Sequence, residues 1–147
     1  MKVMLDLNVL VDVLQRREPF FAASAKVCDL VHSRRISGVV PSHAVTTVFY
    51  LVERHADRSI AENALEWMLS LFGVASEDKG TFRIAKSLKF RDFEDAAVAA
   101  AAQDAGCDFI VSRNIADFSA SPVKTVTPEE LIEMVTVQVP VNEEFND

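Results

Sequence analysis

The stretch that decides the fold of this chain is Met1-Lys2-Val3-Met4-Leu5-Asp6-Leu7-Asn8-Val9-Leu10-Val11-Asp12. The apolar run before Asp6 predicts a short strand over 2–5 that is buried on both faces. After Asp6 the apolar pattern resumes with the spacing of a helix. In open parallel α/β sheets, ligands bind just outside the carboxyl ends of the strands. Asp6 is therefore the first candidate site residue.

The rest of the chain alternates between short apolar runs and longer amphipathic or alanine-rich segments. The predicted strands are 2–5, 36–40, 72–75, 107–112 and 123–126. The predicted helices are 8–15, 20–33, 42–55, 59–71, 76–87, 92–105 and 127–135, with Ser42 and Ser59 as N-caps of the third and fourth. This alternation predicts an α/β domain whose parallel sheet is covered on both faces, with the carboxyl ends of the strands at one edge. We expect a single domain at 1–137 and an acidic tail at 138–147.

Composition limits the classes of function. The formal net charge is −7, from 22 acidic and 15 basic residues, so the chain lacks the global basic field of a non-specific nucleic-acid binder. If its substrate is a polyanion, local basic residues or bound cations must supply the attraction. No apolar run approaches the roughly 18 residues of a membrane span, so no membrane partner is expected. Cys28 and Cys107 occur in no paired motif and are predicted to be buried thiols in a reducing cytoplasm.

Three segments far apart in the sequence bring acids toward the predicted sheet edge. The first is Asp6. The second is the start of the alanine helix, where Asp92 and Asp95 are three residues apart and share a helix face. The third follows the fourth strand, where Asn114 and Asp117 are again three apart. Because a carboxylate between two leucines is costly to bury unless it is hydrogen-bonded, paired or bound to metal, Asp6 is the hardest to explain structurally.

The other acids also have structural interpretations. Asp92 fits an N-cap, and Glu94 and Asp95 fit first-turn acids that answer the helix dipole. Asn114 and Asp117 fit a solvated turn. If the carboxylates converge, they stay ionised only when a cation neutralises them, and Mg²⁺ or Mn²⁺ prefers oxygen ligands. Such a site can activate water and hold the oxygens of a phosphodiester.

Other chemistries fit less well. The three histidines, His32, His43 and His55, have no metal-ligand spacing, and surface or core-edge roles are expected for them. The four glycines form neither a phosphate-binding loop nor a dinucleotide fingerprint. No serine lies in a nucleophile elbow.

Four motifs resemble the PIN domain, in the order of that family and over about residues 2–135. They are LDLNVL at 5–10, FEDA at 93–96, IVSRNIADF at 110–118 and VTPEEL at 126–131. The resemblance implies a three-layer α/β/α sandwich with a central parallel sheet of about five strands, and cleavage of RNA that depends on Mg²⁺ or Mn²⁺. Many bacterial members of this size are VapC-type toxins, homodimers that a cognate antitoxin protein holds inactive.

The resemblance also implies roles for individual residues. Asp6, Asp95 and Asp117 would be the catalytic residues and metal ligands. The residues expected to line the pocket or contact substrate are Asn114, Glu94, Thr47 and Arg113. Two roles remain open for Arg113, Lys89 and Arg91: contact with substrate phosphates, or a structural role.

One departure from the family pattern concerns the helix after the second strand. PIN nucleases commonly place an acid there, whereas residues 42–50 contain none. Thr46 or Thr47 offers a hydroxyl instead, and Glu53 lies at least one turn further on. Asn114 also fills with a neutral amide a position that is Asp or Asn in the family. The reduced negative charge predicts weaker metal affinity.

Three hypotheses follow. The leading one is a metal-dependent endoribonuclease, the toxin component of a toxin–antitoxin pair. The alternative, motivated by the missing helix acid, is a catalytically impaired PIN-like module that binds RNA or a protein partner. A third is a phosphatase of the haloacid-dehalogenase type with Asp6 as nucleophile. That chemistry requires a second acid two residues later, where this chain has Asn8.

Overall fold

The computed structural model describes residues 1–137, and the predicted tail at 138–147 lies outside them. The strands are β1 (Lys2–Leu5), β2 (Ser37–Pro41), β3 (Gly73–Ala75), β4 (Phe109–Val111) and β5 (Thr125–Val126). The helices are α1 (Leu7–Leu14), α2 (Phe21–His32), α3 (Ser42–His55), α4 (Arg58–Leu71), α5 (Lys79–Ser87), α6 (Phe93–Asp104) and α7 (Pro128–Val137). A short 3₁₀ helix, η1 (Ile115–Phe118), follows β4. Every predicted strand and helix is present in the described part of the chain.

The five strands form one parallel sheet in the order β3-β2-β1-β4-β5. The chain moves outward from β1 to β2 and β3, and then returns to the other side of β1 for β4 and β5. The strand order therefore reverses between β1 and β4, and this switch point is where open α/β sheets bind their ligands. Asp6 follows β1 and Ser112 follows β4, so both lie at this crevice.

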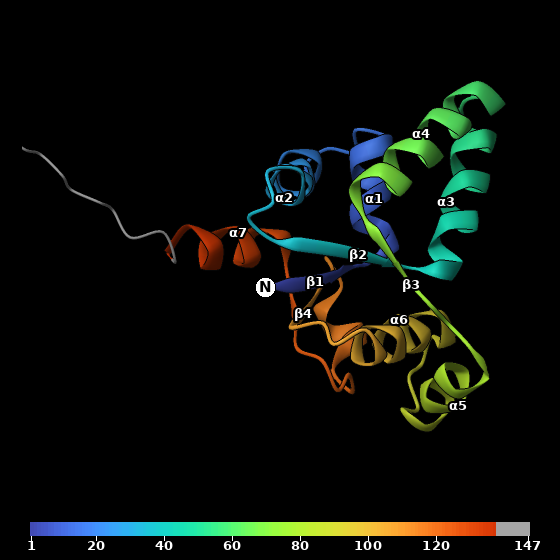
Figure 1. Cartoon of the computed structure of the whole chain (residues 1–147), viewed down its shortest axis with the longest axis vertical. Helices are drawn as coiled ribbons and strands as arrows, with labels where there is room; N and C mark the ends of the chain where they lie inside the picture. Colours follow the sequence, from blue (N-terminus) through green and yellow to red (C-terminus); the bar gives the residue numbers. More distant parts are fainter. Residues whose placement is uncertain (138–147) are drawn as a thin grey trace, which may run out of the picture.

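Helices cover both faces of the sheet, as the three-layer prediction requires. In Figure 1, α1 to α4 lie on one side of the strands, and α5 and α6 lie on the other. Alternate residues of β1 enter the two layers: Val3 and Leu5 pack into the core beneath α1 to α4, whereas Met4 packs with β4 and α6. All three are fully buried, which confirms the prediction of a strand buried on both faces.

Helix α6 lies close against the sheet because its side chains are small. Its seven buried residues are Ala96, Ala97, Val98, Ala99, Ala100, Ala101 and Ala102. Gly106 adopts φ +68°, the left-handed conformation predicted for the residue that ends this helix. At the other end, the Asp92 carboxylate accepts hydrogen bonds from the backbone N–H groups of Glu94 (2.8 Å) and Asp95 (3.4 Å). The cap holds the first turn of α6 at the carboxyl edge of the sheet.

Three predicted helix starts are wrong in detail. Ser42 does not cap α3, because its hydroxyl donates to Glu77 (3.0 Å) instead. Helix α4 is capped by Asp57, whose carboxylate accepts from the N–H of Ile60 (2.8 Å), rather than by Ser59. Helix α5 begins at Lys79 rather than at 76, because Asp78 forms a capping box with Thr81. In α4, an aspartate two residues earlier takes the place of the predicted serine cap.

Two further expectations concern the thiols and the membrane. Cys28 and Cys107 are both free and buried, as predicted. Burial raises the pKa of the Cys28 thiol to about 12, so it behaves as an apolar side chain. Within residues 1–137, no helix combines the length and the apolarity that crossing a membrane requires.

Candidate active site: an acidic pocket at the switch point

A small pocket of about 220 Å³ lies at the carboxyl edge of the sheet, between β1 and β4. Its lining residues are Asp6, Leu7, Asn8, Asp92, Glu94, Asp95, Asn114 and Asp117. A larger hollow of about 530 Å³ shares Asp92, Asp95 and Asp117 and adds Arg91 and Phe93. The structure therefore brings together the three segments that supply Asp6, Asp95 and Asp117. We call the smaller space the acidic pocket.

Asp6 is held in place by two hydrogen bonds from opposite sides. Its Oδ1 accepts from the N–H of Leu7 (2.8 Å), so Asp6 is the N-cap of α1. Its Oδ2 accepts from the hydroxyl of Ser112 (2.8 Å), which follows β4 and is fully buried. Only 4% of Asp6 is exposed, and burial raises its pKa despite these two bonds. The carboxylate links the ends of the two strands that border the switch point.

Asp95 shows most directly that the pocket is crowded with negative charge. Its pKa is raised to about 7, first because it is half-buried and then because of the charges of Asp6, Asp92, Asp117 and Glu94. Burial and like charges both disfavour the ionised form. Without a cation, Asp95 is therefore only partly ionised at neutral pH, and a bound cation would restore its charge.

The donor set fits a hydrated hard cation better than a dehydrated one. Within residues 1–137, no three Asp, Glu, His or Cys side chains lie close enough to form a ready-made ligand set. The acids surround the pocket without meeting at a single point. Mg²⁺ keeps several of its waters and commonly binds through one or two carboxylates, so this spacing suits an ion that contacts some acids through water.

Arg113 and Thr47, two of the residues predicted to line the pocket, do not line it. The Nε and one terminal nitrogen of Arg113 donate to both oxygens of Asp12 (2.7 and 3.1 Å), and the guanidinium lies 3.9 Å from the ring centre of Phe20. Asp12 is completely buried, so it needs this partner. The Thr47 hydroxyl donates to the backbone carbonyl of His43 (3.1 Å), as side chains within helices often do.

The helix after β2 carries an imidazole near the pocket instead of an acid. Glu77, on the connection between β3 and α5, has a side chain that is only 2% exposed. It accepts hydrogen bonds from the Ser42 hydroxyl (3.0 Å), the His43 backbone N–H (2.9 Å) and His43 Nδ1 (2.7 Å). The other ring nitrogen, His43 Nε2, lies 3.7 Å from Oε1 of Glu94. Glu77 thus replaces a conventional cap and fixes the orientation of His43.

Sequence reasoning missed the roles of His43, Glu77 and Asp12. His43 and Glu77 are 34 residues apart, and Asp12 and Arg113 are 101 apart. No spacing within one element relates the members of either pair. Glu53, which lies further along α3, pairs with Arg58 (3.2 Å) and does not line the acidic pocket. Asp92 combines two roles that seemed alternatives, since it caps α6 and also lines the pocket.

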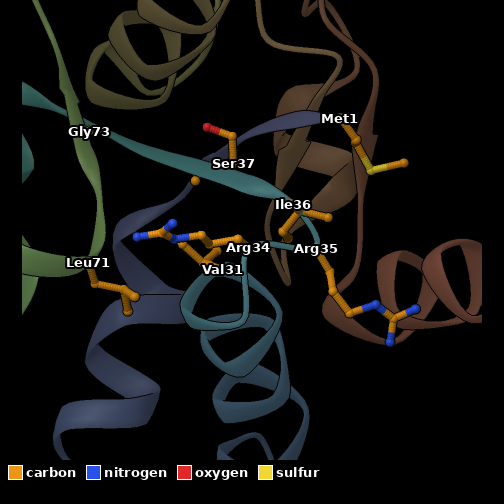
Figure 2. A pocket seen from close by; sticks show the side chains of 9 residues that line it. Met1, Val31, Arg34, Arg35, Ile36, Ser37, Leu71 and Gly73 are labelled. Atoms are coloured by element: carbon orange, nitrogen blue, oxygen red, sulfur yellow. The ribbon is translucent and has the colours of Figure 1, made fainter.

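A second cavity, of about 450 Å³, lies at the opposite edge of the sheet, near the start of β2. Figure 2 shows that the guanidinium of Arg34 extends toward Leu71, whereas that of Arg35 points away toward another helix. Arg35 donates to the carbonyl of Val135 in α7 (3.4 Å). Because the two cations diverge, this cavity gathers no charges around a ligand, and the acidic pocket remains the candidate active site.

Comparison with known proteins identifies a family and a relative of this chain. A family model described as PIN domain matches residues 2–116. "Ribonuclease VapC1" of Aquifex aeolicus (strain VF5) is 26% identical over 137 residues, which cover 90% of this chain and 94% of the relative.

Solved structures share the fold at lower identity. VapBC2 from Rickettsia felis, bound to a DNA fragment from its promoter, has a TM-score of 0.70 at 16% identity and covers 86% of this chain and 98% of its own. The Sarcin-Ricin loop cleaving toxin VapC20 of Mycobacterium tuberculosis has a TM-score of 0.60 at 14% identity and covers 74% of this chain and 86% of its own.

Proposed function

The chain belongs to the PIN domain family, and from this membership and the acidic pocket we propose a metal-dependent endoribonuclease that hydrolyses RNA phosphodiester bonds. Its biological role is that of the toxin in a toxin–antitoxin pair. The support is the relative named as a ribonuclease and the likeness to VapC structures. The observation that carries the proposal is the crowding of acids around Asp95, whose pKa is raised to about 7 by burial and by the neighbouring carboxylates; a divalent cation is the natural counter-charge for such a cluster.

We assign Asp6, Asp95 and Asp117 as catalytic residues and as the acids that hold Mg²⁺ or Mn²⁺, directly or through water. When bound, such an ion supplies charge stabilisation and a more acidic water for phosphodiester hydrolysis. Ser112 and the N–H of Leu7 keep the Asp6 carboxylate in a fixed orientation. Asn114 and Glu94 line the same pocket and orient the substrate there. Arg113 supports the site from outside by neutralising Asp12.

The test is RNA cleavage by the purified chain with Mn²⁺ or Mg²⁺. We expect cleavage that is lost on chelation and lost in Asp6→Asn. The matched control is Asp29→Asn, which removes an exposed carboxylate of α2 and is expected to leave cleavage unchanged. Intact RNA after incubation with metal-loaded wild type, together with equal cellular toxicity of wild type and Asp6→Asn, would rule the proposal out.

The alternative function is a catalytically impaired module that binds RNA or a protein partner. Two observations favour it: α3 presents His43 rather than an acid, and no three metal-ligating side chains within 1–137 form a compact set. Calorimetry separates the two functions. Absence of divalent-ion binding with retained RNA or antitoxin binding supports the module, whereas metal binding with turnover supports the nuclease. The phosphatase hypothesis is dropped, because residue 8 in the pocket is an amide and the family is a different one.

The proposal extends to partners and location. Solved structures similar in fold are toxin–antitoxin complexes, such as one from Klebsiella pneumoniae (TM-score 0.65, 19% identity). We propose that this chain likewise binds a cognate antitoxin protein, forms a homodimer and acts in the cytoplasm. Affinity purification of the chain from its native host, followed by mass spectrometry and light scattering of the purified complex, measures both associations. A chain that stays monomeric and purifies without a companion contradicts this part of the proposal.

A further inference from the structure

A basic segment runs along α6 and ends at Arg91, which lines the hollow beside the acidic pocket. Residues 79–91, which form α5 and the connection to α6, contain no acidic residue. They contain five basic residues, Lys79, Arg83, Lys86, Lys89 and Arg91. All five are exposed, in a chain whose net charge is −7 and which has only 15 basic residues. This concentration of positive charge lies where a polyanion would approach the pocket.

Two phenyl rings are interleaved with these cations. Phe82 of α5 is 40% exposed and Phe93 of α6 is 53% exposed. Their ring centres are 6.5 Å apart, and their planes are inclined by only 29°. A single exposed apolar side chain is ordinary on a protein surface, whereas a group of them indicates a contact surface. We call the exposed residues among 79–91, together with Phe93, the α5 surface.

The geometry of α5 keeps one ring and two cations on the same side of the helix. Residues three and four apart in a helix share a face, which aligns Lys79, Phe82 and Lys86. The opposite side is buried through Thr81 and Ala85, and Ala85 packs against the alanines of α6. Figure 1 shows α5 on the outer side of α6, away from the sheet. Within residues 1–137, the face that carries Lys79, Phe82 and Lys86 is therefore exposed to solvent.

The α5 surface is continuous with the acidic pocket. Phe93 and Arg91 line the hollow of about 530 Å³ whose other lining residues include Asp95 and Asp117. A ligand bound across α5 thus enters the carboxylate site without leaving the protein surface. This continuity distinguishes the two exposed rings from apolar residues elsewhere on the molecule.

We propose that the α5 surface binds single-stranded RNA, with unpaired bases stacked on Phe93 and Phe82 and phosphates contacted by the α5 cations. The inference rests on the proposed ribonuclease function and adds to it the residues that hold the bases and the phosphates of the substrate. Aromatic side chains stack on any exposed base, whereas a duplex hides its base faces. The carboxylates of the pocket repel the phosphates of an RNA strand, and the cations of the α5 surface attract them.

The same surface suits an acidic protein partner less well. An acidic polypeptide that paired with the α5 cations would also bring its carboxylates beside Asp95 and Asp117 in the adjoining hollow, where like charges repel. The two exposed rings, whose centres are 6.5 Å apart, offer flat faces on which a base stacks, and an acidic polypeptide segment has no group that matches them. The position of the rings at the entrance of the pocket therefore favours RNA.

The first experiment measures the affinity of a fluorescein-labelled ten-nucleotide RNA by anisotropy, with Mn²⁺ and in an Asp6→Asn background that prevents cleavage. Phe93→Ala is expected to weaken binding by about 5- to 150-fold, the range found for loss of one stacked base. Phe93→Trp is expected to keep the affinity and Phe93→Leu to lose it, because leucine is apolar but has no flat face. Tyr50→Ala, which removes another exposed ring (55%) on α3, is the matched control and is expected to change nothing.

The second experiment measures the salt dependence of the same affinity. Each phosphate contact to a single strand contributes about 0.7 to the slope of log affinity against log salt. Removing two cations in Lys86→Ala/Lys89→Ala is therefore expected to lower that slope by about 1.4. Lys26→Ala/Lys124→Ala, which removes two exposed lysines outside the α5 surface, is expected to leave it unchanged. The fully paired duplex of the same sequence is expected to bind weakly and to be insensitive to Phe93→Ala.

The outcomes separate this inference from the proposed function. If wild type cleaves RNA but Phe93→Ala keeps both its affinity and its kcat/KM, the inference is wrong and the nuclease stands. If wild type does not cleave but the binding pattern holds, the α5 surface is confirmed on an RNA-binding module. Equal affinity for the duplex and the single strand overturns the inference. The inference is also overturned if the α5-surface variants lose binding to a co-purified protein partner while they keep the wild-type affinity for RNA.

Discussion

Asp95→Asn is expected to stabilise the metal-free protein at neutral pH. The pKa of Asp95 is raised from 3.8 to about 7 in the folded state. At about 1.4 kcal/mol for each pH unit, this difference corresponds to about 4 kcal/mol. Asp95 is only partly buried, so solvent screens its repulsion from the other acids, and a contribution of about 1–2 kcal/mol is the realistic expectation.

The direction of the pH dependence follows from which state binds the proton. Between about pH 4 and pH 7, folded Asp95 keeps a proton that the unfolded chain releases. The stability of the wild type in chelator therefore falls as pH rises through this window and levels off above it. The amide of the Asp95→Asn variant does not titrate, so the variant lacks this contribution. We expect Asp95→Asn to exceed the wild type by the full amount at pH 8 and by only about a third of that amount at pH 5, which lies about one unit into this window.

Thermal unfolding in chelator, followed by circular dichroism at pH 5 and pH 8, measures the effect. A gain of about 1–2 kcal/mol corresponds to roughly 3–8 °C in Tm for a domain of this size. Millimolar Mn²⁺ is expected to raise the Tm of the wild type and to raise that of Asp95→Asn less. Asp29→Asn on the exposed face of α2 serves as the control. The reasoning is refuted if Asp95→Asn gains nothing at pH 8, or gains as much at pH 5.

Three further predictions concern stability and are measured by urea unfolding. Arg113→Ala leaves the fully buried Asp12 without its ion partner and is expected to cost about 3 kcal/mol; a loss below about 1 kcal/mol would show that Asp12 finds another partner. Glu77→Ala removes the acceptor at the start of α3 and is expected to cost about 1–2 kcal/mol, whereas an unchanged midpoint would mean that water replaces it. Gly38→Ala places a Cβ 2.8 Å from Cγ2 of Val31 and is expected to cost about 1–3 kcal/mol; a stabilised variant would contradict this.

The parts of the fold predicted from the sequence are those with local causes. The strand at β1 is visible because Val3, Met4 and Leu5 are all apolar, which a strand buried on both faces requires. The end of α6 is visible because Gly106 follows a run of alanines and only glycine adopts positive φ without cost. The exact helix starts were less predictable. Asp57 and Ser59 are both good caps, and the backbone path that decides between them is set by packing.

The residues of the site also fall into those that the sequence predicts and those that only the tertiary structure reveals. Asp6, Asp95 and Asp117 were identified because each follows a strand or begins a helix at the predicted sheet edge, and parallel topology brings such ends together. The partners of the site were not identified. Glu77 meets His43 only because β3 lies beside β2 in the sheet. For Arg113 the sequence left open a phosphate contact and a structural role, and its hydrogen bonds to the buried Asp12 favour the structural role.

The helix ends explain how one pocket holds so many acids. Asp6 caps α1 and Asp92 caps α6, so each carboxylate accepts backbone N–H groups at the positive end of a helix. At Asp6 these bonds lower the pKa and partly oppose the effect of burial. Asp95 makes no cap of its own, and burial first, then the charges of the neighbouring acids, raise its pKa to about 7. If a cation binds in this pocket, Asp95 is therefore the acid whose protonation responds most. A titration of its carboxyl carbon by NMR, with and without Mg²⁺, is expected to show the pKa fall on metal addition, and an unshifted curve would place the ion elsewhere.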